Sequence, residues 1–565
     1  MWLWILSGIM ALVLPSFVKL LRSSRAVAAF INGWPWLRRQ VSNLVIHINT
    51  ASTPPRPNPH SLWTPPGGGG SRPDWAVRNP GNEEQGAQAM RDAAFVSWEA
   101  LTNRSYVDRH LPPAAKADLP TIEALTQLFL REPGAAMRRS GSNSVFLGIF
   151  AQWFTDSFLR TDPNDLRRTT ATHEIDFCQI YGLNDAVCHG LRLGEGGLLR
   201  SRMTNTGEYP ELLLENGVPR PVFAGFGYCQ AAAPGGPLLI DAAMGATLGD
   251  PTLAATRRAH LYATGLERGS SNVGYAAVST LFLREHNRLA RAIQAAHRDW
   301  GDDRIFEAAR NTVIAIGLKI VIEDYIVQIA GTPIRLKMDP GFAAKQSWNR
   351  TNRIAVEFNL LYRWHSMVPD EVVLDGTAHP FPMLQFNNAM LEEFGLERLI
   401  DALSRQPAGW IGVGNVPRWL EAAEHNAHAM SRRFALAGMN DYRQRFGLKR
   451  LASFEELTDD PVLRLKLSAM YGGRIDAVEL LPGLFAEGDH GDASFGSLLL
   501  RMVGYDAFSQ ALTNPLLAPQ LWNEATFSDI GWAAIHATDG VDDVFRRNTG
   551  ATAAQRASFG IIPER

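Results

Sequence analysis

The part of this 565-residue chain that most limits its fold and chemistry is the run EFNLLYRWHS at residues 357–366. It lacks glycine and proline, and a helical pattern continues upstream of it through residues 352–356. We therefore predict one helix, on which residues three apart share a face. Tyr362 and His365 have this spacing, so a phenol and an imidazole should lie side by side. Such a histidine can ligate a metal or a haem iron, but both residues can equally be ordinary core residues.

The order of the residues around this pair is more informative than the pair alone. The pattern Glu-Phe-Asn-x-Leu-Tyr-x-Trp-His at residues 357–365 resembles the proximal helix of the cyclooxygenase branch of the animal haem peroxidases. The resemblance implies haem b (iron protoporphyrin IX) as cofactor, with His365 as its axial ligand. It also implies that Tyr362 forms a radical that removes a hydrogen atom from a fatty acid. Further segments in the same order extend the resemblance over roughly residues 95–530.

The expected architecture is a mostly α protein. The sequence is dense in leucine and alanine at helical spacing and has few alternating runs typical of strands. Its length and its 46% hydrophobic content are sufficient for a large core. We expect a Pro/Gly-rich linker over residues 53–94. Residues 95–565 should then form a catalytic domain with the animal haem-peroxidase, cyclooxygenase-like fold.

Residues 1–52 have the composition of a membrane-binding module of amphipathic helices. The first acidic residue of the chain is Asp74, and the lysines and arginines before it alternate with tryptophan, phenylalanine and leucine. This pattern is typical of helices that lie in a membrane interface. We therefore expect a membrane-associated, monotopic protein, as the resemblance also implies. For residues 1–22, a secretory signal and a spanning anchor remain as alternatives.

The segment FLGIFAQWFTDSF at residues 146–158 resembles the distal helix of the same family. In that family a glutamine and a histidine, four residues apart, face the open side of the haem iron. Gln152 matches the glutamine, but Asp156 occupies the position of the histidine. A carboxylate has an ordinary pKa of about 3.9 and a shorter reach than imidazole, so we expect a weakened peroxidase reaction. The alternative is that both residues are merely polar positions on an apolar helix.

A lipid oxygenase also needs an apolar tunnel that leads to the radical. The resemblance implies that Tyr325 hydrogen-bonds Tyr362. It gives as channel residues Ile322, Ile326, Ile329, Phe358, Trp364, Val503, Ala507 and Gln510. Gln510 occupies the position of a glycine and should shorten the tunnel, and Asn49 and Thr332 occupy the positions of the family's carboxylate-binding arginine and tyrosine. A shorter acid, a substrate without such a clamp, or a molecule other than a fatty acid therefore remains open.

The sequence thus predicts a haem-dependent fatty-acid dioxygenase that uses an unsaturated fatty acid or related lipid and O2. Two alternatives are a haem peroxidase of small reductants and a haem-binding membrane protein without oxygenase activity. The net charge of −2 gives no indication of nucleic-acid binding. Three cysteines are too few for a disulfide framework. Animal members of the family are dimers, which makes a homodimer an expectation for this chain.

Overall fold

A computed structural model describes residues 24–51 and 102–563, apart from residues 112, 115–116, 232, 234–235, 351–352 and 489–492. The described part is mostly helical, as predicted. Its α-helices are α2 (Arg25–Gly33), α3 (Pro35–Ala51), α6 (Ile122–Phe129), α7 (Val145–Thr155), α8 (Cys178–Tyr181), α9 (Asp185–Leu191), α10 (Leu239–Leu248), α11 (Pro251–Arg258), α12 (Val273–Ala296), α13 (Asp302–Ile320), α14 (Ile326–Ala330), α15 (Pro340–Ala343), α16 (Val356–Leu361), α17 (Asn388–Phe394), α18 (Leu396–Arg405), α19 (Glu421–Arg433), α20 (Met439–Arg445), α21 (Phe454–Leu457), α22 (Pro461–Met470), α23 (Leu480–Ala486), α24 (Ser497–Ala511), α25 (Glu524–His536) and α26 (Val541–Asn548).

Short antiparallel ribbons make up the β-structure of these residues. β1 (Arg139–Ser144) pairs with β8 (Pro407–Gly409) across a long stretch of sequence. The other pairs are local: β2 (Ser201–Thr204) with β3 (Gly207–Pro210), β4 (Leu214–Glu215) with β5 (Val218–Pro219), and β6 (Glu371–Leu374) with β7 (Thr377–Pro380). The helices therefore form the core, and the ribbons connect them.

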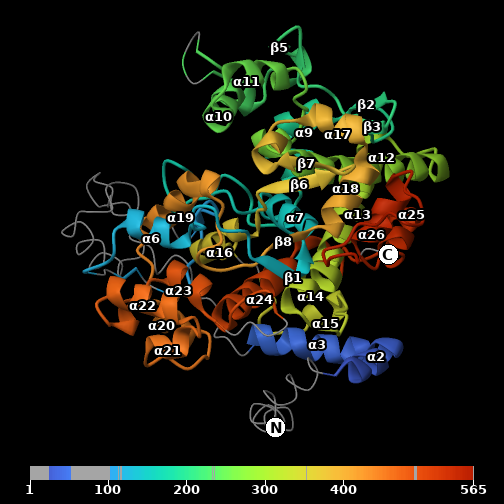
Figure 1. The fold of residues 1–565 in the computed structure, drawn as a ribbon. Helices are drawn as coiled ribbons and strands as arrows, with labels where there is room; N and C mark the ends of the chain where they lie inside the picture. Colours follow the sequence, from blue (N-terminus) through green and yellow to red (C-terminus); the bar gives the residue numbers. More distant parts are fainter. Residues whose placement is uncertain are drawn as a thin grey trace.

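Helix α7 runs through the middle of this core (Figure 1). Ser144 caps its start by accepting a hydrogen bond from the Leu147 amide at 3.3 Å. Its side chains are apolar on almost every side, which is typical of a helix that is buried all round. It packs against α12 and α18. The helix predicted at residues 146–158 is therefore confirmed as far as Thr155, and Asp156 is its C-cap.

The predicted single helix over residues 352–366 is wrong. The chain is extended up to Ala355, because the Asp108 amide donates to the Ile354 carbonyl at 2.7 Å and the Val356 amide donates to the Asp108 carbonyl at 2.9 Å. Helix α16 then covers only Val356–Leu361, and Tyr362 is its C-cap. A separate 3-10 turn, η7, covers His365–Met367. Tyr362 and His365 therefore belong to two different segments.

Helices α2 and α3 lie together along one edge of the molecule, at the bottom of Figure 1. Two polar side chains of α3 bind Asp339, Arg39 through Nε at 2.5 Å and Asn43 through Nδ2 at 3.0 Å. Phe30, Trp34 and Trp36 nevertheless remain 61%, 62% and 72% exposed. Within residues 24–51 and 102–563, no helix is both long and apolar enough to cross a membrane. The alternatives for residues 1–22 and the predicted linker at 53–94 lie outside the described residues.

Candidate functional site

The histidine predicted as an axial ligand is held by a carboxylate from a distant helix. Nδ1 of His365 lies 2.7 Å from Oε2 of Glu424 on α19. The other oxygen of Glu424, Oε1, lies 3.3 Å from Nε2 of His428, one turn further along α19. Burial would raise the pKa of Glu424, but the two histidines outweigh it and lower the pKa from 4.5 to about 2. The carboxylate is therefore ionised, and His365 is left with Nε2 for a metal.

The residues around His365 fit a haem. Gln152, Asn359, Tyr362 and His365 are only half-buried, although most of their neighbours in sequence are fully buried. This exposure indicates that they border solvent-accessible space inside the fold. A haem-ligating imidazole needs one free ring nitrogen and a partner on the other, and His365 has this arrangement. His365 could therefore hold the iron.

Gln152 and Asp156, the two residues predicted for the distal side of the haem, lie at the C-terminal end of helix α7. Oε1 of Gln152 accepts a hydrogen bond from Nδ2 of Asn272 at 3.2 Å. Asp156 is 9% exposed, and its Oδ2 has no hydrogen-bond partner among the described residues. Burial raises the pKa of Asp156 above 3.8, and the nearby positive charges of Arg268 and Arg160 oppose this rise. The aspartate is thus a buried carboxyl that can exchange a proton closer to neutral pH than a free one.

Arg363 links the two sides of the site. Burial and the nearby charge of Arg268 lower its pKa to about 10, and the charges of Asp156 and Glu424 act in the opposite direction. Asp156 at the end of α7 and Glu424 on α19 therefore both act on one guanidinium. The structure thus brings the predicted distal residues and His365 into one region, as the resemblance implied.

Tyr362 lies in a row of aromatic rings. Its ring stacks on Trp364 with centroids 4.7 Å apart and meets Phe358 edge-on at 5.3 Å. Phe358 stacks in turn on Phe158 at 5.7 Å, and Trp364 lies 4.8 Å from Phe495. The Tyr362 hydroxyl is buried and has no hydrogen-bond partner among the described residues. A phenol in this setting is shielded from water and has limited means of losing its proton.

Tyr325 lies beside Tyr362, as predicted. It is the last residue of a π-helical turn, η6 (Val321–Tyr325), which joins α13 to α14. Burial raises the pKa of Tyr362, while the Tyr325 phenol partly offsets this rise and the charge of Asp506 adds to it. The two hydroxyls influence each other but do not form a hydrogen bond in this structure. The two tyrosines therefore lie side by side as predicted, but the predicted hydrogen bond between them is not formed.

The predicted channel residues lie on three segments of the core. Ile322, Ile326 and Ile329 follow one another through η6 and α14, and Phe358 and Trp364 flank Tyr362. Val503, Ala507 and Gln510 lie on α24, which packs against α16. All eight are buried. Nε2 of Gln510 donates to the His173 carbonyl, so this amide is fixed in place.

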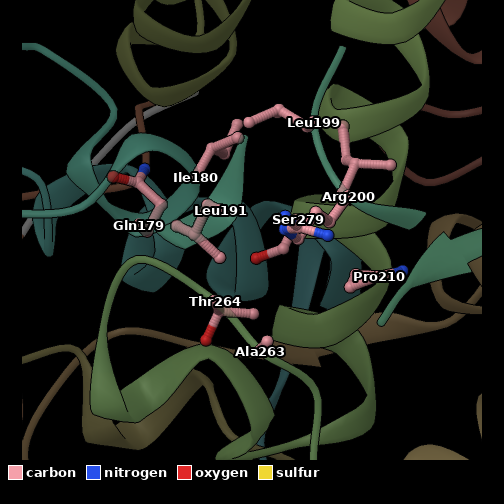
Figure 2. A pocket seen from close by; sticks show the side chains of 10 residues that line it. Gln179, Ile180, Leu191, Leu199, Arg200, Pro210, Ala263, Thr264 and Ser279 are labelled. Atoms are coloured by element: carbon pink, nitrogen blue, oxygen red, sulfur yellow. The ribbon is translucent and has the colours of Figure 1, made fainter. Parts of the chain in front are cut away.

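A separate small pocket lies between α8, α9 and α12 (Figure 2). Aliphatic side chains such as Ile180 and Leu191 line it, together with the polar residues Gln179 and Ser279. None of the predicted site residues lines this pocket. It is therefore distinct from the candidate haem site.

Sequence reasoning missed Glu424, Asn272 and Arg363. Glu424 lies 59 residues after His365, on the buried face of α19. No spacing rule connects a carboxylate to a histidine over such a distance. Arg363 lies within the resembling segment, but at a position that its pattern leaves unspecified. Its electrostatic interaction with Asp156 and Glu424 becomes visible only in three dimensions.

Comparison with known proteins supports the resemblance. The model of the family "Animal haem peroxidase" matches residues 154–559. Prostaglandin G/H synthase 2 of Equus caballus is 32% identical over 457 residues, which cover 78% of this chain and 70% of that protein. Prostaglandin G/H synthase 1 of Canis lupus familiaris is 32% identical over 447 residues, covering 77% of this chain and 69% of that protein.

Solved structures share the fold at lower identity. The fatty acid alpha-dioxygenase of Oryza sativa superposes with a TM-score of 0.62 at 16% identity, covering 81% of this chain and 84% of that one. Peroxidase A of Dictyostelium discoideum superposes with a TM-score of 0.60 at 18% identity, covering 81% of this chain and 95% of that one. The predicted mostly helical, animal haem-peroxidase fold is thereby confirmed, while the membrane-binding role of the N-terminal helices stays a prediction.

Proposed function

Because this chain belongs to the animal haem peroxidase family and is a haem-dependent oxidoreductase, we propose that it oxygenates fatty acids by way of a radical on Tyr362. The observation that supports the proposal best is the position of Tyr362. Its phenol lies between the segment of His365 and the apolar residues of η6, α14 and α24, and aromatic rings surround it. A hydrogen atom can be removed cleanly from a substrate only where water is excluded from the radical.

In the proposed reaction, haem held by His365 supplies a one-electron oxidation. Tyr362 gives up one electron and its phenolic proton. The resulting phenoxyl radical takes a hydrogen atom from a carbon of the substrate, which restores the phenol and leaves a carbon radical. O2 then adds to this carbon, and the peroxyl radical so formed takes a hydrogen atom back from Tyr362, which gives a hydroperoxide and restores the phenoxyl radical. Tyr325 stabilises the neutral and radical forms of Tyr362 differently, since its hydroxyl can turn toward the oxygen of Tyr362.

The proposed substrate is a fatty acid. The relatives in sequence are prostaglandin G/H synthases, and a structural relative, the fatty acid alpha-dioxygenase of Oryza sativa, has been solved with palmitic acid. Gln510 places a fixed amide among the channel residues of α24. The amide oxygen of Gln510 has no hydrogen-bond partner among the described residues, and such an oxygen is unfavourable beside a hydrocarbon chain. We therefore expect the substrate to be a shorter fatty acid than the one that would fit if this residue were glycine.

Asp156 is the proposed proton carrier on the distal side. A carboxylate can take a proton from one peroxide oxygen and return it to the other, but its reach is shorter than that of an imidazole. We therefore propose that reaction with peroxides is slow and serves to start the radical reaction. Gln152, held by Asn272, would donate a hydrogen bond on the same side.

Helices α2 and α3 are the proposed membrane contact. Phe30, Trp34 and Trp36 of this segment are exposed, and α3 packs against α24, the helix that carries three of the channel residues. Large aromatic side chains favour the membrane interface. A fatty acid could thus enter the protein from a lipid surface without crossing bulk water.

Oxygen uptake by the haem-loaded protein tests this function. The assay uses fatty acids of different chain length and unsaturation, with a trace of hydroperoxide. Tyr362→Phe should abolish uptake and keep the haem absorbance. Tyr228→Phe removes another buried hydroxyl, bonded at 2.6 Å to the Thr264 carbonyl, and should keep oxygenation. Uptake that persists in Tyr362→Phe would contradict the radical role, and no uptake by the intact haem protein with any acid would contradict the substrate class.

A further inference from the structure

We propose that Glu424 and His428 form a pair behind His365 that orients the ligating imidazole and lowers the reduction potential of the bound haem. The inference rests on the proposed role of His365 as axial ligand. It does not depend on which substrate the protein oxidises.

The hydrogen bond between His365 and Glu424 fixes the state of the imidazole. Oε2 of Glu424 is a strong acceptor at 2.7 Å, so Nδ1 of His365 carries the hydrogen and donates it. Nε2 then keeps its lone pair, which is the form that binds iron. The bond also stops rotation of the ring about its Cβ–Cγ axis. Glu424 is therefore a positioning residue for His365.

His428 lies on the other side of the carboxylate, close to it but without a hydrogen bond to it. Glu424 and His428 are four residues apart on α19 and so lie on one face of the helix. Nε2 of His428 is 3.3 Å from Oε1 of Glu424, and the two side chains are only 1% and 2% exposed. The ring of His428 is itself packed edge-on against Phe129, with centroids 4.8 Å apart. The carboxylate thus has an imidazole on each side and little access to water.

A negative charge in this position changes the chemistry of the ligand. An imidazole that donates to a carboxylate gives more electron density through its other nitrogen than one that donates to a neutral group. A more basic ligand stabilises ferric iron relative to ferrous iron, which lowers the reduction potential. Because the Glu424 side chain is only 2% exposed, solvent screens its charge less than it would at the surface.

The test measures the haem potential rather than turnover. Glu424→Gln keeps the shape and a hydrogen-bond acceptor for His365, but removes the negative charge. We expect the ferric–ferrous equilibrium to shift at least tenfold toward ferrous haem, which is about 59 mV for one electron. The iron–histidine stretching frequency in the resonance Raman spectrum should fall with it. Glu421→Gln is the matched control, since Glu421 is an exposed residue of the same helix.

His428→Phe keeps the aromatic packing against Phe129 and removes only the ring nitrogens. It should shift the potential in the same direction by a smaller amount. If Glu424→Gln fails to retain haem, His428→Phe decides the question alone. A potential and a stretching frequency equal to those of the unsubstituted protein would overturn the inference. Because neither measurement uses a substrate, failure of the proposed oxygenation would leave this result intact.

Discussion

Nε2 of His110 lies 3.0 Å from each carboxylate oxygen of Asp506, and neither side chain is exposed to solvent. The ring of His110 packs edge-on against Phe446 and Tyr505, with centroids 5.0 and 5.6 Å away. Asp506 belongs to α24, one residue before Ala507, and its charge contributes to the raised pKa of Tyr362. A buried contact between a histidine and a carboxylate therefore lies near the tyrosine proposed to form a radical.

Asp506→Asn should destabilise the protein by about 3 kcal/mol, because removing one charge of a buried pair leaves its partner poorly compensated. The measurement is the midpoint of urea unfolding. Asp529→Asn is the control, since Asp529 pairs with His297 at 2.7 Å on the surface and its loss should barely move the midpoint. Equal shifts in the two variants would show that burial of the His110 contact has no energetic consequence.

Asp156→His should raise peroxidase turnover with a small reductant about 100-fold, because an imidazole is a longer and better matched proton carrier. Its pH dependence should change as well. The carboxylate acts as a base only when ionised, so the rate of the unsubstituted protein should rise with pH through a pKa that burial has moved above 3.8. In the variant this rise should move to about 6.5, the ordinary value for histidine. Asp459→His, at an exposed position, should leave the rate unchanged.

Asp324→Asn should make the protein more stable at neutral pH. Burial raises the pKa of Asp324 to about 6 from 3.8, so the folded protein binds this proton more tightly than the unfolded chain does. Stability contributed by the protonated group is full below pH 3.8 and is lost as the pH rises to about 6, at a total cost of roughly 3 kcal/mol. Asparagine avoids this loss and can still accept the hydrogen bond that the Val541 amide donates at 3.0 Å.

Unfolding free energies measured from pH 4 to pH 8 test this prediction. The fall in stability between pH 4 and pH 6 should be smaller in Asp324→Asn than in the unsubstituted protein. Asp459→Asn, a change at an exposed carboxylate, should leave the pH profile as it was. An unchanged profile in Asp324→Asn would mean that this carboxyl is not the group that titrates.

Replacing Trp34 and Trp36 by alanine should weaken binding to anionic phospholipid vesicles by about tenfold or more, because each indole loses a large apolar contact with the interface. Sedimentation of the protein with vesicles measures the effect. Leu465→Ala is the control, since Leu465 is 72% exposed but lies on α22, away from α2 and α3. If the control weakens binding as much as the tryptophan variants, α2 and α3 are not the membrane contact.

The sequence predicted the helical fold well because its signals are local. The apolar run that becomes α7 identifies its helix without reference to the rest of the chain. The helix predicted over residues 352–366 was wrong for a non-local reason, since the backbone near Ile354 pairs with Asp108 from far upstream. Glu424 was missed for a similar reason, because only the folded chain brings α19 to His365.

The break between α16 and η7 also determines what could be moved into another protein. On one continuous helix, the distance between the phenol and the imidazole would follow from helical pitch, and a single grafted segment would carry both. Here the stacked ring of Trp364 holds Tyr362, while α19 holds His365. A transplant of residues 357–366 alone would therefore transfer the phenol and the imidazole, but not their relative positions. The smallest set of residues that could be transplanted with its geometry intact is discontinuous in sequence. It must include the face of α19 that carries Glu424.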